Sequence, residues 1–365
     1  FNIGYARVSV LFIATFVGYL AAAPSTGMIV RRLGYGRAYC LATIIVLIGN
    51  FINCSQHSNF NLMCFGYFVV GNGFANQLGI GHAYFAILRR PLLYMGFLHG
   101  TFSLGAFASP LVATVMTSHG LPFNYFYFTS LGMGIFALLS IWLAFRRLTV
   151  LPVQPDEIAL GPQTAFSVLK MRPVWSIAVF LLLYVGAEDS IGGWIVTYAR
   201  TVRHATPTTA SWISSSFYLG KPLSTSLPSC LAIGRITLPS LNLILGERRA
   251  VFIYLLVALA LEAVAWAVPA VASTAISTAL VGLAMSTFYL GAITIGGRLL
   301  PRSVHVDAFA LMSSIGQSGS ALFPLIVGLV SSKKGIWIVE PTVIALLGVQ
   351  GACWYLVPKV QKRED

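Results

Sequence analysis

The sequence predicts an all-α protein that crosses a membrane many times, and two observations support this fold class. Of the 365 residues, 57% are hydrophobic and only 9% are charged, with a mean hydropathy of +0.82. This composition lies far outside that of soluble domains. The apolar runs are also long and unalternating, as in residues 8–23 and 251–271. Because backbone groups in lipid must be satisfied internally, such runs predict helices, whereas barrel strands would be short and alternating.

The order of apolar runs along the chain predicts eleven transmembrane helices. Glycine, proline or charged residues separate the runs. They lie at about 8–28, 38–55, 61–88, 92–117, 123–145, 173–199, 208–245 (interrupted), 250–269, 272–297, 305–330 and 336–357.

The net charge is +13, and the basic residues lie in short clusters between the apolar runs, as in membrane proteins whose loops set the topology. They do not form one continuous basic face, so we expect no nucleic-acid partner. Basic clusters occupy alternate loops, which the positive-inside rule makes cytoplasmic, together with the C-terminus. We expect an integral membrane protein that is monomeric in the lipid bilayer. The plasma membrane is the default location, and the vacuolar membrane remains open. The clusters are Arg31, Arg32, Arg37; Arg89, Arg90; Arg146, Arg147, Lys170, Arg172; Arg248, Arg249; Arg298, Arg302; and Lys359, Lys362, Arg363.

An internal repeat divides the chain into two halves. Residues 33–38 (Leu-Gly-Tyr-Gly-Arg-Ala) recur as 245–250 (Leu-Gly-Glu-Arg-Arg-Ala), and the Gly and Pro-Leu of 105–111 recur in 319–325. Two matches at nearly one offset predict two pseudo-symmetric bundles in parallel orientation, as in transporters built from paired six-helix bundles. The predicted domains are an N-terminal bundle (1–146), a central cytoplasmic loop (147–172), a C-terminal bundle (173–358) and a cytoplasmic tail (359–365). The loop at 31–37 matches the one after the second helix of a half, so the pattern predicts that helix 1 precedes Phe1.

The segment 221–231 interrupts an otherwise apolar helix with one lysine and two prolines. Each proline costs about 3 kcal/mol in a helix interior. We interpret the segment as an insertion, such as an intron retained in frame, with a genuine re-entrant break as the alternative.

Three stretches resemble a known family. These are residues 186–197 (Gly-Ala-Glu-Asp-Ser-Ile-Gly-Gly-Trp-Ile-Val-Thr), 98–114 and 316–324, and together they are similar to the fucose permease-like group of fungal major facilitator proteins. The resemblance covers nearly the whole chain apart from 221–231. It implies the major facilitator fold and transport by alternating access.

The chain departs from the family at two places. The superfamily's loop between helices 2 and 3 has an acid where this chain has Arg31, which puts gating through that loop in doubt. The family's symporters also have an acid in helix 4, whereas residues 71–77 contain none. The candidate residues for a cytoplasmic gate are basic: Arg31, Arg32, Arg37 and Arg249.

Two adjacent carboxylates in the seventh helix are the first candidates for binding or coupling. Glu188 matches the family motif, and a carboxylate at membrane depth is a functional hypothesis by default. Asp189 lies about 100° further round a regular helix, so we expect only one of the two to face a given cavity. All ten Asp and Glu residues lie at or after Asp156, so any proton coupling must use the second half. A position in the aqueous vestibule or in a structural ion pair is the alternative for both.

The remaining candidates are polar or aromatic. Trp194 is expected either to stack on a sugar or to anchor the helix at the interface. Asn72 and Asn76 lie on one stripe of the fourth helix, and Gln77 and His82 lie off it; amides suit sugar hydroxyls and helix–helix bonds equally. His99 and Gln317 occupy equivalent helices of the two halves, with packing as the alternative role.

These features predict a carrier of a small polar, sugar-like solute, with protons as a possible coupling ion. Two alternatives stay open: a drug or metabolite exporter, and a non-transporting receptor or defective paralogue. The sequence contains no catalytic constellation, phosphate loop or metal-ligand spacing, so we expect no enzyme, no cofactor and no metal site.

Overall fold

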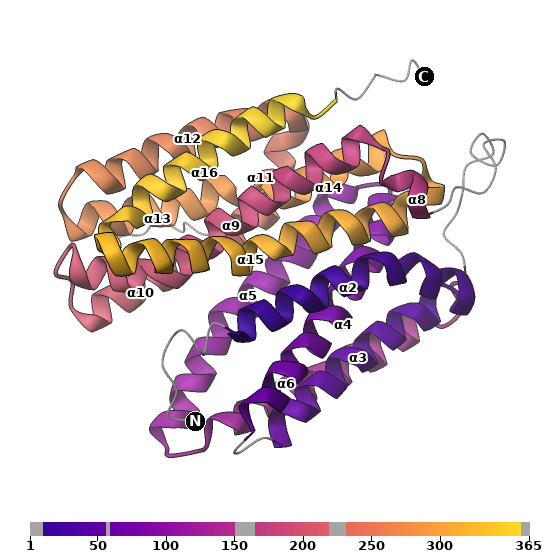
Figure 1. Cartoon of the computed structure of the whole chain (residues 1–365). Coiled ribbons are helices and arrows are strands. Elements are labelled where there is room, and N and C mark those ends of the chain that lie inside the picture. Colours follow the sequence, from indigo (N-terminus) through magenta and orange to yellow (C-terminus); the bar gives the residue numbers. More distant parts are fainter. Residues whose placement is uncertain (1–9, 56–58, 150–164, 219–230, 359–365) are drawn as a thin grey trace.

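The computed structural model describes residues 10–55, 59–149, 165–218 and 231–358, and helices make up most of that chain (Figure 1). The first half contains α2 (Val10–Leu33), α3 (Tyr35–Ser55), α4 (Phe60–Ala86), α5 (Pro91–Ser118), η1 (Phe123–Tyr125) and α6 (Phe126–Phe145). A short helix, α8 (Ala165–Val168), precedes the second half. There the helices are α9 (Arg172–Thr201), α10 (Pro207–Tyr218), α11 (Leu231–Leu245), α12 (Glu247–Ala267), α13 (Val271–Met285), α14 (Phe288–Leu299), η2 (Arg302–Val304), α15 (His305–Lys334), η3 (Ile336–Ile338) and α16 (Val339–Leu356).

Every predicted apolar run corresponds to a helix or a pair of helices. The run at 208–245 contains α10 and α11, and the suspected insertion between them lies outside the described residues apart from Leu231. The run at 272–297 is broken into α13 and α14 at Ser286 and Thr287, which the sequence did not predict. Within the described chain, eight helical stretches are long and apolar enough to span a membrane.

The backbone reproduces the internal repeat. Gly34 separates α2 from α3 with φ of +79°, and Gly246 separates α11 from α12 with φ of +81°. These are the glycines of the matching Leu-Gly pairs at 33–34 and 245–246. Positive φ is readily adopted by glycine alone, so the same residue makes the same sharp turn in both halves. Most of the predicted central loop falls within 150–164, outside the described residues, so the domain bounds stay a prediction.

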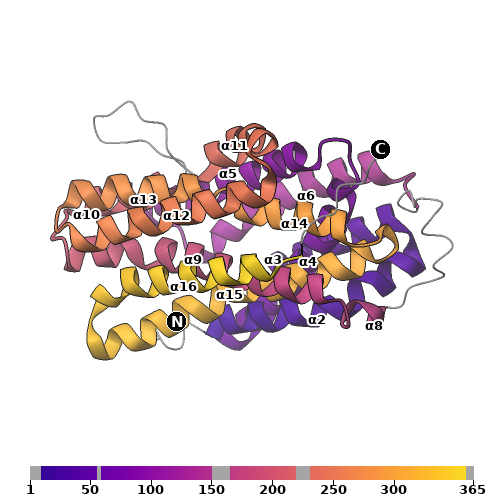
Figure 2. The ribbon, with the colours of Figure 1, turned by 90° about the horizontal axis from the view of Figure 1, so that it is seen from above.

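The helices form two groups that lie side by side (Figures 1 and 2). In the first group, α4 packs against α2 and α3, and α3 packs against α6. In the second, α9 packs against α15 and α16, and α12 packs against α13 and α16. The groups meet where α2 and α4 contact α15 and where α5 contacts α11.

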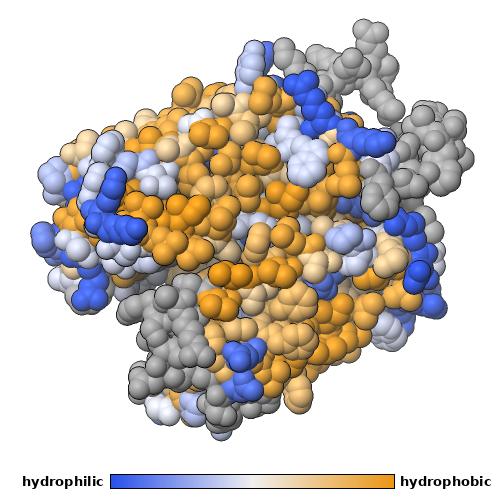
Figure 3. Space-filling model, in the orientation of Figure 1, coloured by the Kyte–Doolittle hydropathy of each residue, from blue (hydrophilic) through white to orange (hydrophobic). Residues whose placement is uncertain are grey.

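The surface matches a membrane environment. Hydrophobic side chains cover most of the face shown in Figure 3, and hydrophilic ones gather mainly towards the ends of the helices. The outermost helix of the first group, α6, has no buried residue, and Phe136 on it is 67% exposed. An exposed face of this composition is stable in lipid and not in water. We call the end of the helices that carries Arg31, Arg89, Arg146, Arg248 and Arg298 the basic end.

Candidate functional site

A cavity of about 180 Å³ lies between the two helix groups, and both groups line it. We call it the central cavity. Its walls are partly aromatic, with Tyr39, Phe74 and Phe102 from the first half and Tyr289 from the second. Its polar lining consists of Gln77, His99, Glu188, Asp189, Arg235 and Gln317.

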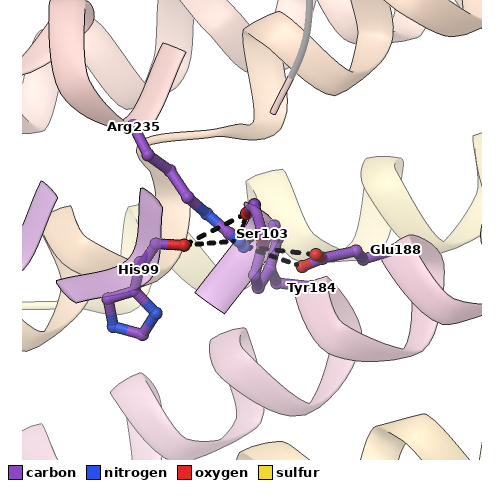
Figure 4. A network of polar contacts seen from close by, with 5 residues as sticks. All are labelled: His99, Ser103, Tyr184, Glu188 and Arg235. Atoms are coloured by element: carbon purple, nitrogen blue, oxygen red, sulfur yellow. Dashed lines mark hydrogen bonds and ion pairs between the residues drawn. The ribbon is translucent and has the colours of Figure 1, made fainter. Parts of the chain in front are cut away.

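Arg235 on α11 is the centre of a buried polar network (Figure 4). Its Nη2 donates to the Tyr184 hydroxyl at 2.9 Å and to both carboxylate oxygens of Glu188 at 3.2 and 3.3 Å. Its Nη1 donates to the backbone oxygen of His99 at 3.3 Å and to the Ser103 hydroxyl. Tyr184 and Glu188 lie one turn apart on α9, and His99 and Ser103 lie one turn apart on α5. One guanidinium therefore connects the two halves of the molecule.

The pairing explains how these charges tolerate burial. Arg235 is 2% exposed and Glu188 is 7% exposed. Removing one partner of such a pair leaves an uncompensated buried charge, which costs about 3–5 kcal/mol. Asp189 adds a second carboxylate to the same cavity, so two potential negative charges face one guanidinium.

Glu188 and Asp189 both line the central cavity, which corrects the expectation that only one of them would face it. The expectation treated the cavity as a point, whereas the cavity extends across more than one side of α9. Asp189 also lines a second cavity of about 720 Å³, which we call the wide cavity. The wide cavity lies towards the end opposite the basic end, between Tyr19 on α2, Ser214 on α10 and Ser320 on α15. Asp189 therefore stands at the boundary between the two cavities.

His82 and His99 form a buried pair beside the central cavity. Their Nε2 atoms lie 3.2 Å apart, and the Tyr289 ring centroid is 4.8 Å from that of His99. His82 Nδ1 also shares a hydrogen bond of 3.0 Å with the Ser313 hydroxyl on α15. Of the two histidines, His99 lines the cavity, and His82 joins the first half to the second behind it.

The asparagine stripe on α4 faces α2. Asn76 accepts a hydrogen bond from the Thr26 hydroxyl at 2.8 Å and donates to the backbone oxygen of Asn72 at 2.9 Å. Asn72 donates to the Gly18 oxygen at 3.5 Å. By contrast, Gln77 lines the central cavity and donates to the Thr43 hydroxyl at 2.8 Å. The structure thus separates the amides into a helix-pairing set and a cavity residue.

Trp194 and Gln317 occupy different environments. The Trp194 indole donates to the Pro324 oxygen at 3.0 Å and packs beside Gly328 on α15. Trp194 lines neither of the two cavities described above, although Gly192, Gly193 and Val196 around it line the wide one. Gln317 lies in the wall of the central cavity.

Arg31 forms an ion pair across the two halves at the basic end. Its Nη1 lies 2.7 Å from the Asp307 carboxylate on α15, beside Gly27 of α2. The family's acid is absent from the loop, but a contact between the halves exists with an arginine on the first-half side. Arg32, Arg37 and Arg249 are exposed at the same end.

Arg235 was missed as a site residue by sequence reasoning, together with Tyr184 and Ser103. Arg235 lies within the interrupted apolar run at 208–245, and the sequence alone suggested no role for it. A usable signal was present, because an arginine inside an apolar run is costly in a membrane unless it has a partner.

This fold, with a charged cavity between two parallel helix groups, defines a membrane transport protein. The model of the Major Facilitator Superfamily matches residues 1–236, and the chain belongs to that superfamily. Members of the superfamily are transporters and not enzymes.

Particular relatives are distant. The chain is 21% identical to the Bypass of stop codon protein 6 of Saccharomyces cerevisiae over 401 residues, covering 100% of this chain and 78% of the yeast protein. It is 25% identical over 213 residues to a glucose/galactose transporter of Brucella abortus, covering 54% of this chain and 51% of that protein.

Solved structures share the fold. The Escherichia coli fucose:proton symporter superposes with a TM-score of 0.76 at 16% identity, covering 97% of this chain and 92% of that one. A human organic anion transporter gives a TM-score of 0.73 at 15% identity, covering 96% and 83%.

Proposed function

We propose that this protein carries a small polar, sugar-like solute across its membrane by alternating access, coupled to protons. The observation that carries the proposal is the buried Arg235–Glu188 pair in a cavity lined by both halves. Transporters of this architecture bind solute between their repeats, where rocking of one half against the other exposes the site to each side in turn.

The lining of the central cavity favours a hydroxylated solute. Gln77 and Gln317 each offer a donor and an acceptor, which is the pattern that a sugar hydroxyl needs. Phe74 and Phe102 supply apolar surface for the carbon faces of a ring. The volume of about 180 Å³ is below the ~300–1,000 Å³ typical of sites for drug-sized ligands, which favours a small solute over the exporter alternative. The glucose/galactose and fucose:proton relatives support the same class.

The charge count in the cavity supports coupling to protons. Glu188 and Asp189 face one guanidinium, so a proton on one carboxyl would make the three groups neutral together. Neutralisation lowers the cost of moving a charged site through a low-dielectric interior. The first half has no carboxylate to share this role, because the first acid in the sequence is Asp156.

We assign the gate to the basic end. Arg31 and Asp307 join the halves there, and Arg32, Arg37 and Arg249 surround that face. The positive-inside rule makes this end cytoplasmic, with the C-terminus on the same side. The wide cavity then opens to the outside, and the plasma membrane is the expected location.

The test is solute uptake by the full chain in proteoliposomes with an inward proton gradient. We expect accumulation of at least one monosaccharide from a panel of hexoses and 6-deoxyhexoses. Glu188→Gln should abolish gradient-driven accumulation above the external concentration, while solute exchange without a gradient survives. Glu262→Gln is the matched control, because Glu262 is also buried, on α12, and lines neither of these cavities.

Two results would contradict the proposal. Unchanged accumulation by the Glu188→Gln variant would show that the Glu188 carboxylate is not needed for proton coupling. Solute binding without exchange in the unmodified chain would favour the receptor alternative.

A further inference from the structure

A groove of about 550 Å³ lies between α3 and α6 at the basic end, on the first half and away from both cavities. Arg37 and Cys40 line it from α3, and Trp142, Arg146 and Arg147 line it from α6 and the turn that follows. We call it the arginine groove. Of its lining residues, only Arg37 also has a place in the proposed mechanism, at the edge of the gate.

The groove is lined by positive charge, and none of the described acidic residues lines it. None of the ion pairs between described residues includes Arg37, Arg146 or Arg147. All three arginines are exposed, and no acidic residue precedes Asp156 in the sequence. Three guanidinium groups in one concave surface, each with planar N–H donors, match the oxygen atoms of a phosphate group.

The arginines are held by rigid backbone. The amide of Gly36 donates to the Leu148 oxygen at 2.8 Å, and the amide of Tyr35 donates to the Thr149 oxygen at 2.8 Å. A Cβ atom on Gly36 would lie 1.9 Å from the Phe145 oxygen, so α3 and α6 approach closely because this residue is glycine. The Arg146 guanidinium also lies 4.9 Å above the Trp142 ring. The groove is therefore a preformed surface in which Arg37 and Arg146 are attached to two helices in direct contact.

The remaining walls are apolar and continue into the exposed face of the same helices. Leu41 and Ile44 line the groove. Further along, Ile48, Leu139 and Leu143 are 50%, 55% and 62% exposed. A ligand with an anionic head and a hydrocarbon tail can contact both the arginines and the apolar side chains beside them. A free anion would contact only the arginines.

We infer that the arginine groove binds an anionic phospholipid, with the headgroup phosphate against Arg37, Arg146 and Arg147 and an acyl chain along α3 and α6. Basic pockets between transmembrane helices at the positive side of a membrane protein suit such headgroups. This inference is independent of the transported solute.

The experiment is native mass spectrometry of the purified full chain titrated with phosphatidylserine and, separately, with phosphatidylcholine. Each arginine near an anionic headgroup contributes roughly fivefold to the affinity. We therefore expect R146Q/R147Q to weaken phosphatidylserine binding about 25-fold and R37Q about fivefold. R89Q/R90Q is the matched control, because it removes two adjacent, exposed arginines from the same end but outside the groove.

The control pair should bind phosphatidylserine within about twofold of the unmodified chain. Equal weakening by R146Q/R147Q and R89Q/R90Q would overturn the inference, because general attraction to the basic end would then suffice. Tight phosphatidylcholine binding that needs the arginines, or displacement of the lipid by millimolar inorganic phosphate, would also overturn it. If R146Q/R147Q does not fold, R146K/R147K replaces it: lysine keeps the charge but not the planar donors, so weaker phosphatidylserine binding is expected, and undiminished binding would contradict the site.

Discussion

The two ends of the interface between the halves differ although the same helices, α2 and α15, form both. At the basic end, Arg31 pairs with Asp307, and a Cβ atom on Gly27 would overlap the Asp307 carboxylate. Deeper in the same interface, Gly79 of α4 packs against Ala310 of α15. At the opposite end, the wide cavity of about 720 Å³ separates α2 from α15. One end is closed and the other is open.

Close packing of small residues contributes more to the closed end than its ion pair does. The Arg31 side chain is 52% exposed, and an ion pair of this exposure contributes about 0–1 kcal/mol. Small residues do more, because Gly27 and Gly79 allow the helices to approach closely enough to exclude solvent and solute. Contacts between small residues can separate without breaking a strong polar interaction, which the proposed alternating access requires.

A bulky side chain at the closed end should have the largest effect on the difference between the two ends. A Cβ atom on Gly79 would lie 2.8 Å from Ala310, so Gly79→Leu should force the basic end open and, by rocking, narrow the wide cavity. The reporter is Ser214→Cys, in the wide cavity of a chain whose natural cysteines have been replaced. We expect an impermeant maleimide to label this cysteine about tenfold more slowly in the Gly79→Leu variant than in the parent, which corresponds to about 1.4 kcal/mol.

Gly105→Leu on α5 is the control for this substitution, since no described atom lies within 4 Å of a Cβ atom there. Its labelling rate should stay near that of the parent. Equal slowing in both variants would mean that bulk in any helix, and not the closed contact, sets access.

Breaking the ion pair should give a smaller shift. Asp307→Asn leaves Arg31 without its partner, so we expect a two- to fivefold change in the same labelling rate and in a distance measured between spin labels at the basic end. The exchange R31D/D307R should restore the parent values. Failure of the exchange to restore them would show that the pair is not the interaction being lost.

Asn76→Ala should leave the two ends unchanged and alter stability alone. The change removes the hydrogen bond from Thr26, and such bonds between membrane helices contribute about 0.6 kcal/mol on average. Thermal unfolding should shift slightly while the solute KM stays constant. Gln77→Ala, one residue further and in the central cavity, should raise the solute KM instead. The opposite pattern would mean that Asn76 binds the solute and that Gln77 only stabilises the fold.

The sequence predicted the helices well, because membrane burial imposes long apolar runs with no alternative structure. The repeat was also visible, since Gly34 and Gly246 occur where only glycine adopts the backbone conformation easily. The break between α13 and α14 was not predicted, because it falls at Ser286 and Thr287. Serine and threonine also occur within unbroken membrane helices, so they do not mark a helix end.

The site was only partly predictable. Glu188 was visible as a carboxylate within an apolar helix, whereas its partner Arg235 lies 47 residues away and became a partner only through the packing of α9 against neighbouring helices. Helical spacing gives the angle between two side chains on one helix but not the shape of the cavity beside it. It therefore could not show that Glu188 and Asp189 line the same cavity. Nor could it show that Asn76 faces α2, because amide side chains suit both environments.

The unequal number of carboxylates and guanidinium groups in the central cavity has an electrical consequence. In the proposed mechanism, an unloaded carrier with Glu188 and Asp189 both ionised would move one net negative charge when its halves rock, and protonation of one carboxyl would remove that charge. A full elementary charge crossing the membrane changes in free energy by about 2.3 kcal/mol per 100 mV. The return of the empty carrier should therefore depend on membrane voltage, and the loaded, protonated passage with a neutral solute should not.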